Sequence, residues 1–501
     1  MQRSAGILMA ISSLPSNYGI GTFGKAAYEF ADFLEASGQK FWQMLPLGPT
    51  SFGDSPYQSF STFAGNPYYV DPDMLIKDGL LTKEEVESFD WGENDEVMAD
   101  GARRVNYEKI YNSRFKLLAL AKERGWDKNI DKIEAFRKDN KEWLENYALF
   151  MALKRHFNMY SWLDWPEDAI RNHEAEAVEK YTEELREDIE LFVFIQYEFF
   201  KQWEMLRDYI HGKGIKIIGD IPIYVAMDSS DAWAERRFLQ FDEKGFPLNV
   251  GGVPPDYFNA DGQLWGNPLY DWNKIEADGY GWWIRRIGAV TKLFDVIRFD
   301  HFRALDEYWA VPYGSPTAIT GEWIKGPGMK FINVLNSWFH GTEFIAEDLG
   351  MLGPSVHELV KESTWPGMKV LQFAFPEDDD SEYLPHNHVE NSICYTGTHD
   401  NNTCLGWFSE ADEGDVKKAV KYLGLNENEG YVYGFIRGGM SSVAKLFVAP
   451  MQDYLNEGEE CRMNLPGVTN CGNWQYRMPK DALKPELAEK IKEITKLYGR
   501  V

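Results

Sequence analysis

Short apolar runs recur along the chain, each bounded by turn residues, and several are followed by a stretch with helical periodicity. Eight runs predict buried strands: Gly6–Ala10, Phe41–Leu45, Ile215–Gly219, Phe294–Phe299, Glu343–Ala346, Lys369–Phe373, Ser392–Tyr395 and Lys445–Val448. Buried strands that alternate with helices are typical of an α/β protein with a parallel sheet. Eight such strands favour a closed (β/α)8 TIM barrel over the alternative, an open doubly wound sheet.

Two spans interrupt this alternation. Residues 75–200 are polar and acidic with helical periodicity, as in Lys141–Arg155 and Val178–Asp208, and predict a helical insertion after the second strand. Residues 228–285 are rich in Gly, Pro, Asn and Trp with little periodicity, and predict a loop-rich insertion after the third strand. A loop of that length inside a compact domain usually carries function. We therefore expect residues 1–501 to form one barrel domain with two insertions.

Composition narrows the possible partners. The chain has 501 residues, 44% hydrophobic and 26% charged, which is typical of a soluble globular protein. Its net charge of −27 repels phosphate backbones and anionic lipid, so we expect neither nucleic acid nor membrane partners, but a neutral or cationic substrate. The 18 Trp, 26 Tyr and 31 Phe fit either a large core or exposed rings that pack on sugars.

Neither a targeting signal nor a membrane span is evident. The apolar stretch Gly6–Ile11 is shorter than the ~7–15 residues of a signal-peptide core, and no stretch reaches the ~18 apolar residues of a membrane span. The four cysteines (Cys394, Cys404, Cys461 and Cys471) form no C-x-x-C pair and fit a reducing compartment. These features predict a cytoplasmic protein.

A glycine motif near the N-terminus does not indicate a dinucleotide site. Gly19, Gly21 and Gly24 match G-x-G-x-x-G before a helical pattern. In a dinucleotide-binding fold the glycines follow the strand directly, and an acidic residue ends the next strand. Here residues 12–18 intervene, and the second strand ends in Leu45 and Pro46. We expect a tight loop that opens a helix, and no cofactor.

The fourth and fifth predicted strands each end in an acid. Side chains alternate along a strand, so Val296, Arg298 and Asp300 share one face, which in a barrel is the interior. Barrel active sites lie at the C-terminal ends of the strands, where we expect Asp300, held ionised by Arg298. A purely structural Arg–Asp pair explains these two residues equally well. Glu347 ends the next strand among apolar neighbours, and partial burial would raise its pKa and make it a general acid.

Other acids also lie at or just after the ends of predicted strands. We expect Asp348 to point away from Glu347 and to cap the following helix. Asp400, beside His399, lies just beyond the seventh strand, and Asp220 ends the third. Carboxylates crowded at one rim repel each other, so their joint presence favours a function. Two carboxyls that flank a bond suit glycoside cleavage. Metal binding is the rival use of clustered acids, which the nearby Arg and His side chains disfavour.

At these residues the sequence resembles the amylomaltases, the 4-α-glucanotransferases also called disproportionating enzymes, within the α-amylase superfamily. The resemblance covers nearly the whole chain. It rests on Ser13–Ser16, Trp42–Pro49, Gly53–Ser59, Ala64–Pro67, Pro254–Phe258, Gly262–Pro268, Arg462–Gly467 and Gly472–Trp474. The loop after Gly467 departs from the family pattern. This difference affects the expected shape of the acceptor side of the site. The family usually lacks the C-terminal β-domain of α-amylases, and here only about one helix is expected after Trp474.

The resemblance implies a role for each site residue. Asp300 is expected to be the nucleophile, Glu347 the general acid/base, and Asp400 a third acid that grips hydroxyls of the sugar being cleaved. The residues implied to bind the glucan are Tyr57, Asp220, Arg298, His301 and His399 around that sugar, and Asp256, Gln263, Trp265, Phe373 and Asn464 along the groove.

The implied reaction moves α-1,4-glucan segments between maltooligosaccharides, starch or glycogen-type glucans by a retaining double displacement. That geometry needs two carboxyls about 5–5.5 Å apart. The alternatives are an α-1,4-glucan hydrolase with the same residues, and a glucan-binding protein without turnover. The latter would be expected to lack one of the three carboxylates, and all three are present.

Overall fold

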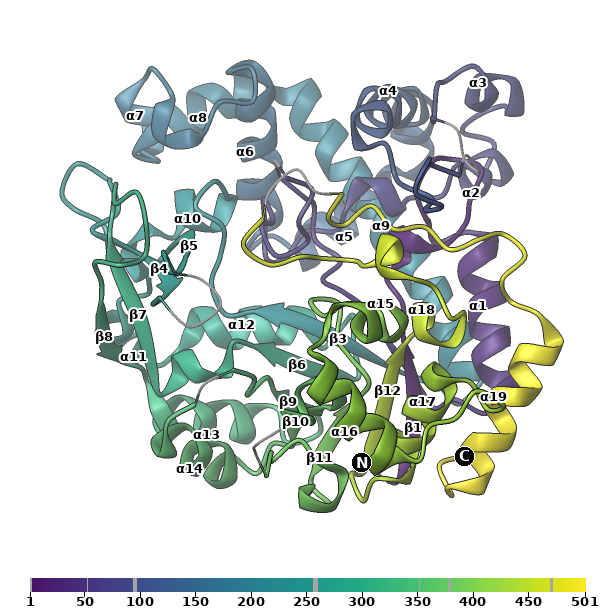
Figure 1. Ribbon diagram of the computed structural model, residues 1–501. Helices are drawn as coiled ribbons and strands as arrows, with labels where there is room; N and C mark the ends of the chain where they lie inside the picture. Colours follow the sequence, from purple (N-terminus) through teal and green to yellow (C-terminus); the bar gives the residue numbers. More distant parts are fainter. Residues whose placement is uncertain are drawn as a thin grey trace.

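Eight parallel strands form the central sheet of the protein. The computed structural model describes residues 2–51, 53–92, 97–255, 260–350, 352–376, 380–468 and 472–501. The strand order is β10-β11-β12-β1-β2-β3-β6-β9. The end strands β9 and β10 also meet, because the Ala346 amide donates to the Pro366 carbonyl at 2.9 Å. The sheet therefore closes on itself, and the predicted (β/α)8 barrel is confirmed (Figure 1).

The bounds of the barrel strands agree with the apolar runs, with small shifts. They are β1 (Ser4–Leu8), β2 (Phe41–Gln43), β3 (Lys216–Pro222), β6 (Val296–Asp300), β9 (Glu343–Ala346), β10 (Gly367–Val370), β11 (Ser392–Tyr395) and β12 (Leu446–Pro450). The largest shift is at β10, which was expected over residues 369–373. The strand ends at Val370, and Leu371–Phe373 form a 3-10 helix. An apolar run does not distinguish these two conformations.

Alternation along each strand separates two hydrophobic cores. Apolar side chains from all eight strands, such as Ile218, Val296 and Ile345, form a cluster of their own, which we place inside the barrel. The intervening residues, such as Ile217 and Ile297, join the larger core shared with the helices. By the same alternation, the polar residues that continue the inner rows are Asp220, Arg298 and Glu347.

Helices cover the outside of the barrel. They are α1 (Lys25–Ala36), α12 (Gly281–Val290), α13 (Gly328–Trp338), α14 (Pro354–Ser363), α15 (Cys404–Glu410), α16 (Glu413–Leu423), α17 (Tyr431–Ser441), α18 (Met451–Tyr454) and α19 (Pro485–Leu497). Helix α19 packs against α1, and after Trp474 it is the one α-helix or strand within the described residues.

A group of helices lies between β2 and β3, at the top of Figure 1. It consists of α2 (Pro72–Lys77), α3 (Lys83–Glu87), α4 (Tyr107–Gly125), α5 (Ile130–Asp139), α6 (Leu144–His156), α7 (Asp168–Arg171), α8 (Ala175–Glu184) and α9 (Arg186–Gly212). The long helix α9 packs against α4, α5, α6 and α1, and then leads into β3. The helical segment anticipated over residues 75–200 thus begins inside α2 and ends inside α9.

The span 228–285 is not the loop that its composition suggested. It contains α10 (Ser230–Ala234), β4 (Asn249–Val253), β5 (Gln263–Pro268), α11 (Trp272–Ala277) and most of α12. Strands β4 and β5 join β7 (Glu307–Pro312) and β8 (Glu322–Lys325) in an antiparallel sheet of order β5-β4-β7-β8. Sequence reasoning missed this sheet because β4 carries Gly251 and Gly252 and one of its partners, β7, lies beyond β6 in the chain. A Cβ on Gly252 would meet the Gln263 carbonyl oxygen at 2.6 Å, so the close strand approach requires glycine.

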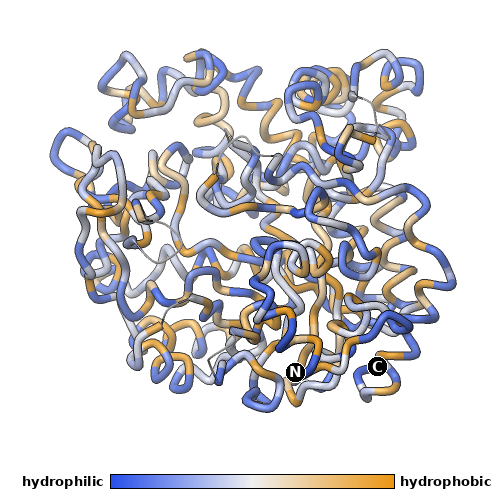
Figure 2. The backbone as a smooth tube through the Cα atoms, in the orientation of Figure 1, coloured by the Kyte–Doolittle hydropathy of each residue, from blue (hydrophilic) through white to orange (hydrophobic). Residues whose placement is uncertain are grey.

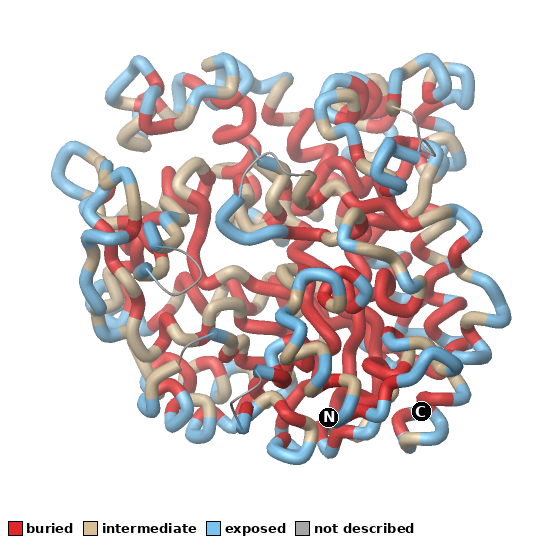
Figure 3. Tube along the Cα trace, viewed as in Figure 1, coloured by how far each residue is buried: buried red, intermediate tan, exposed pale blue. Residues whose placement is uncertain are grey.

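Hydrophobic residues concentrate in the barrel and along the inner helices, as Figure 2 shows. Figure 3 shows that the same segments are buried, while exposed residues follow the outer helices and loops. Within the described ranges, no helix combines the length and the apolar character that crossing a bilayer would require.

Candidate active site

The barrel topology brings three of the predicted acids to the ends of neighbouring strands. Asp220 on β3 is in register with Arg298 on β6, and Arg298 is in register with Ile345 on β9. Asp300 ends β6, and Glu347 directly follows β9. The Glu347 amide donates to the Phe299 carbonyl at 3.1 Å. Asp300 and Glu347 therefore lie side by side at the C-terminal rim of the barrel, where the alternation of side chains predicted them.

A buried guanidinium joins two of these acids. Nη1 of Arg298 lies 2.8 and 2.6 Å from the two carboxylate oxygens of Asp220 and 2.8 Å from Oδ1 of Asp300. The cation among these carboxylates is thus an arginine side chain. Within the described residues, no group of three His, Cys, Asp or Glu side chains is arranged to hold a metal ion.

The protonation of Asp300 differs from the expectation in one respect. Burial raises the pKa of Asp300 to about 6, and Asp220 and Asp400 add to the rise, while Arg298 and His399 oppose it. Arg298 does favour the ionised form, as expected, but it does not outweigh burial. Asp300 is therefore ionised only above mildly acidic pH.

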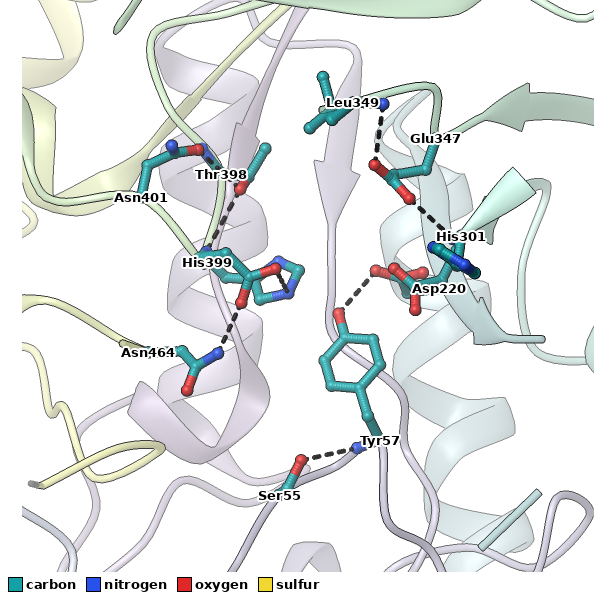
Figure 4. Close-up of polar contacts among 12 residues, drawn as sticks. Ser55, Tyr57, Asp220, His301, Glu347, Leu349, Thr398, His399, Asn401 and Asn464 are labelled. Carbon is teal, nitrogen blue, oxygen red and sulfur yellow. Dashed lines mark hydrogen bonds and ion pairs between the residues drawn. The ribbon is translucent and has the colours of Figure 1, made fainter. Parts of the chain in front are cut away.

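Glu347 is held by the backbone rather than by a cation. Its Oε2 accepts from the His301 amide at 2.8 Å, and its Oε1 accepts from the Leu349 amide at 3.0 Å (Figure 4). His301 has φ +54°, a left-handed conformation that is uncommon for a residue with a side chain. Burial raises the pKa of Glu347 to about 7; Arg298 opposes the rise and Asp300 adds to it. Glu347 can therefore hold a proton near neutral pH.

Asp348 does not cap the following helix, contrary to expectation. The cap residue of α14 is Gly353, and Asp348 is buried with Oδ1 2.6 Å from the Met368 amide that donates to it. Since Met368 lies on β10, Asp348 fastens the end of β9 to the neighbouring strand. The capping prediction is wrong because the partner of this carboxylate is a backbone amide of the neighbouring strand and not the end of a helix.

The loop after β11 carries the third predicted acid. Asp400 Oδ1 accepts from the Asn464 amide at 2.6 Å, and its Oδ2 lies 3.3 Å from His399 Nε2. Burial acts to raise the pKa of Asp400, but His399 and Asn464 prevail and lower it to about 2. Burial lowers the pKa of His399, but Asp400 prevails and raises it above its ordinary value. Asp400 is therefore a stable anion.

An aromatic ring lies between the two sides of this site. Figure 4 places Tyr57 between His399 on one side and Asp220, His301 and Glu347 on the other. The Tyr57 hydroxyl donates to Asp220 Oδ2 at 2.7 Å, and its ring stacks on His399 with centroids 5.2 Å apart and an interplanar angle of 15°.

Trp474 completes this aromatic group, and sequence reasoning did not select it as a site residue. Its ring lies 5.6 Å from Tyr57 and 5.9 Å from His399, centroid to centroid. The sequence signal that could have identified Trp474 was its place at the end of the motif 472–474. Because Trp474 supports two site residues at once, we regard it as a positioning residue.

Of the remaining predicted residues, Trp265 and Gln263 are brought to this centre. Trp265 on β5 meets the His301 ring edge-on, with centroids 4.8 Å apart, and its indole N–H donates to Gln263 Oε1 at 3.2 Å. Burial and Arg303 lower the pKa of His301 to about 4, so its imidazole is neutral. Phe373 is 40% exposed and packs on Tyr383. Asp256 lies outside the described residues.

Comparisons with known proteins identify the family of this chain. The sequence model of a family described as 4-alpha-glucanotransferase matches residues 9–483. The 4-alpha-glucanotransferase of Clostridium butyricum is 50% identical over 98% of this chain and 100% of its own length. That of Thermus thermophilus is 40% identical over the full length of both. The amylomaltase from Streptococcus agalactiae, solved in complex with acarbose, superposes with a TM-score of 0.95 at 38% identity over both whole chains. The chain belongs to the 4-α-glucanotransferase family.

Proposed function

We propose that this member of the family transfers α-1,4-glucan segments to the 4-hydroxyl of glucose or of another α-glucan, through a covalent glycosyl-enzyme on Asp300. The proposal is carried by one observation. Asp300 and Glu347 lie at the ends of adjacent strands, and burial raises the pKa of both, but Arg298 donates to Asp300 whereas Glu347 accepts from two backbone amides. The cation favours the ionised form of Asp300, and Glu347, which has no such contact, can hold the proton, as a nucleophile and a general acid require.

In the first half of the reaction, the Asp300 carboxylate attacks the anomeric carbon of the donor glucan. The bond to the glycosidic oxygen breaks as Glu347 transfers its proton to that oxygen, and the shortened glucan leaves. The Arg298 guanidinium on Asp300 Oδ1 favours the ionised nucleophile and leaves Oδ2 free of that contact.

In the second half, Glu347 accepts the proton of an acceptor 4-hydroxyl. That oxygen attacks the anomeric carbon, and the bond to Asp300 breaks. Two displacements restore the original configuration, and Glu347 regains its proton. The two backbone amides that bind Glu347 hold its carboxyl in place for both steps.

The other site residues suit the binding of the sugar being cleaved. Asp400 is a fixed anion that can accept hydrogen bonds from sugar hydroxyls, and His301 and His399 offer ring nitrogens nearby. Tyr57 offers an aromatic face, and Asp220 fixes its hydroxyl. Asn464 orients Asp400 rather than acting only as a groove residue.

Transfer exceeds hydrolysis only if the acceptor side orients a sugar hydroxyl and excludes water. Proximity of a bound acceptor can supply several kcal/mol of that preference. We assign this role to the edge strand β5, where Trp265 meets the His301 ring and donates to Gln263. The family resemblance adds Asp256 and Phe373 to this assignment. Maltooligosaccharides and starch or glycogen-type glucans are the substrates that this site would accept.

Incubation with maltotriose tests the proposal against a hydrolase. Transfer would yield glucose together with longer maltooligosaccharides, while the number of reducing ends stays constant. A steady rise in reducing ends would refute the transferase and leave a hydrolase. No new product at all would point to a binding protein without turnover.

A cytoplasmic location is also proposed. It is supported by the buried free thiols of Cys394, Cys404 and Cys461, which suit a reducing compartment.

A further inference from the structure

A cavity of about 270 Å³ lies where the helical insertion meets the barrel. Its walls come from the α5–α6 turn, α9, α10 and α12. None of the acids Asp220, Asp300, Glu347 and Asp400 lines it. A narrower cavity next to it, lined by Tyr57 and Asp220, shares the walls Phe63 and Asp231. The outer cavity is therefore separate from the catalytic centre but close to it.

Aromatic side chains give this cavity flat apolar walls. Phe63 and Trp143 are half-buried and nearly parallel, with an interplanar angle of 11° and centroids 6.2 Å apart. Phe200 and Trp282 add further apolar surface. Rings of this kind pack against the C–H faces of sugar rings, because both surfaces are flat and apolar.

The polar groups of the cavity include donors and acceptors together. Its charged lining residues are Asp139, Glu142, Asp231, Glu235, Arg285 and Lys292. The guanidinium of Arg285 lies 3.6 Å from Glu142 and 3.8 Å from Glu235, too far for hydrogen bonds, so it can still donate to a ligand.

One buried donor in this wall is unsatisfied. Trp282 is 3% exposed, and its indole N–H has no hydrogen-bond partner among the described residues. Because this N–H is itself buried, Trp282 contributes the apolar surface of its ring to the cavity rather than a donor.

The charge pattern selects the class of ligand. Two cations in the wall disfavour an ammonium compound, and four carboxylates disfavour an anion. A neutral ring with neighbouring hydroxyls both donates and accepts hydrogen bonds and has apolar faces for the aromatic walls. The volume lies just below the about 300–1,000 Å³ of drug-sized pockets, which suits a single sugar ring.

We propose that this cavity is a second saccharide site, which binds one glucose unit apart from the catalytic cleft. The choice of glucose rests on the proposed function, while the preference for a neutral polyhydroxylated ring does not.

Equilibrium dialysis with radiolabelled glucose tests this site, because glucose alone has no donor and is not turned over. Trp143→Ala should bind one glucose per chain fewer than the wild type, because the variant lacks the stacking face. Trp338→Ala, at a residue that is 64% exposed on α13, is the matched control and should bind as the wild type does. Equal glucose binding by the wild type and Trp143→Ala would overturn the proposal.

A second variant guards against a change in folding. Arg285→Met keeps the length of a partly exposed side chain and should weaken the same site about tenfold, because it loses hydrogen bonds from a charged donor. Unchanged affinity in Arg285→Met would also overturn the site. Transfer from maltotriose by both variants should persist, so a failure of the proposed function would appear in that assay and not in the difference between the binding counts.

Discussion

The β9 side and the β11 side of the active site lie on either side of Tyr57, and both contain a half-buried carboxylate. On the β9 side, Glu347 accepts only neutral backbone amides among the contacts described above, and its pKa rises to about 7. On the β11 side, Asp400 faces His399 and accepts from Asn464, and its pKa falls to about 2. The difference shows that the partners of an acid, more than its burial, decide whether it keeps its proton.

This contrast distinguishes an acid that can take part in the reaction from one that can only bind the sugar. An acid that holds a proton near neutrality can serve as a general acid, whereas a permanent anion can only attract and orient. Asp300 lies between these cases, because Arg298 lowers and burial raises its pKa. Substitutions at or beside these acids and a change of pH test this division.

The largest effect is expected from Asp300→Asn, which removes the nucleophile but keeps the size of the side chain. We expect transfer from maltotriose to fall about 10⁴-fold or more in kcat, since no glycosyl-enzyme can form. Asp208→Asn, at an exposed position on α9, is the control and should keep wild-type activity. Substantial turnover by Asp300→Asn would remove this residue from the reaction.

Replacement of Glu347 by Gln should be the next most severe change. We expect kcat with maltotriose to fall about 10²–10⁴-fold, because the leaving oxygen no longer receives a proton. A maltosyl fluoride donor needs no such proton, so formation of the glycosyl-enzyme from it should be much less affected. An equal loss with both donors would mean that Glu347 is not the acid.

The Asn464→Ala change tests the opposite side. It removes a hydrogen bond to a charged acceptor, worth about 1.5–3 kcal/mol, so kcat/KM should fall about 10- to 100-fold. Asn129→Ala provides the comparison, because that amide donates locally, to the Gly125 carbonyl four positions earlier. If both variants match the wild type, Asn464 does not orient Asp400 in the working enzyme.

The smallest effect should come from a change in pH. The value of kcat/KM should fall about tenfold for each pH unit beyond its plateau. Activity should rise as pH increases through about 6, where Asp300 ionises, and fall as pH increases above about 7, where Glu347 loses its proton. The two values describe the interacting pair. Measurement of kcat/KM from pH 4 to 9 checks this, with Asp208→Asn as the control, and a profile flat through both regions contradicts it.

The site residues on the barrel strands could be predicted from the sequence, because the patterns that identify them lie within single strands. Val296, Arg298 and Asp300 alternate along one strand, and Ile345 and Glu347 along the next, so their shared face followed from the period of two. The eight apolar runs were short, buried and separated by helical patterns, which predicted a parallel barrel.

Other features could not be predicted because their partners are distant in the chain. Strand β4 contains two consecutive glycines and pairs with β7, which follows β6. Asp348 meets Met368 on β10 instead of a helix end. Sequence reasoning placed Asn464 along the groove, but its contact with Asp400 spans 64 positions.

The barrel, its acidic rim and the residues there could be predicted from the amino-acid sequence, because strand periodicity and short motifs are carried by neighbouring positions. Which acid keeps a proton, which is paired with a cation, and where a second cavity opens became known only from the folded chain. Those properties depend on burial and on contacts between segments that are far apart in the chain, and a carboxylate responds to the charges and donors that folding brings to it.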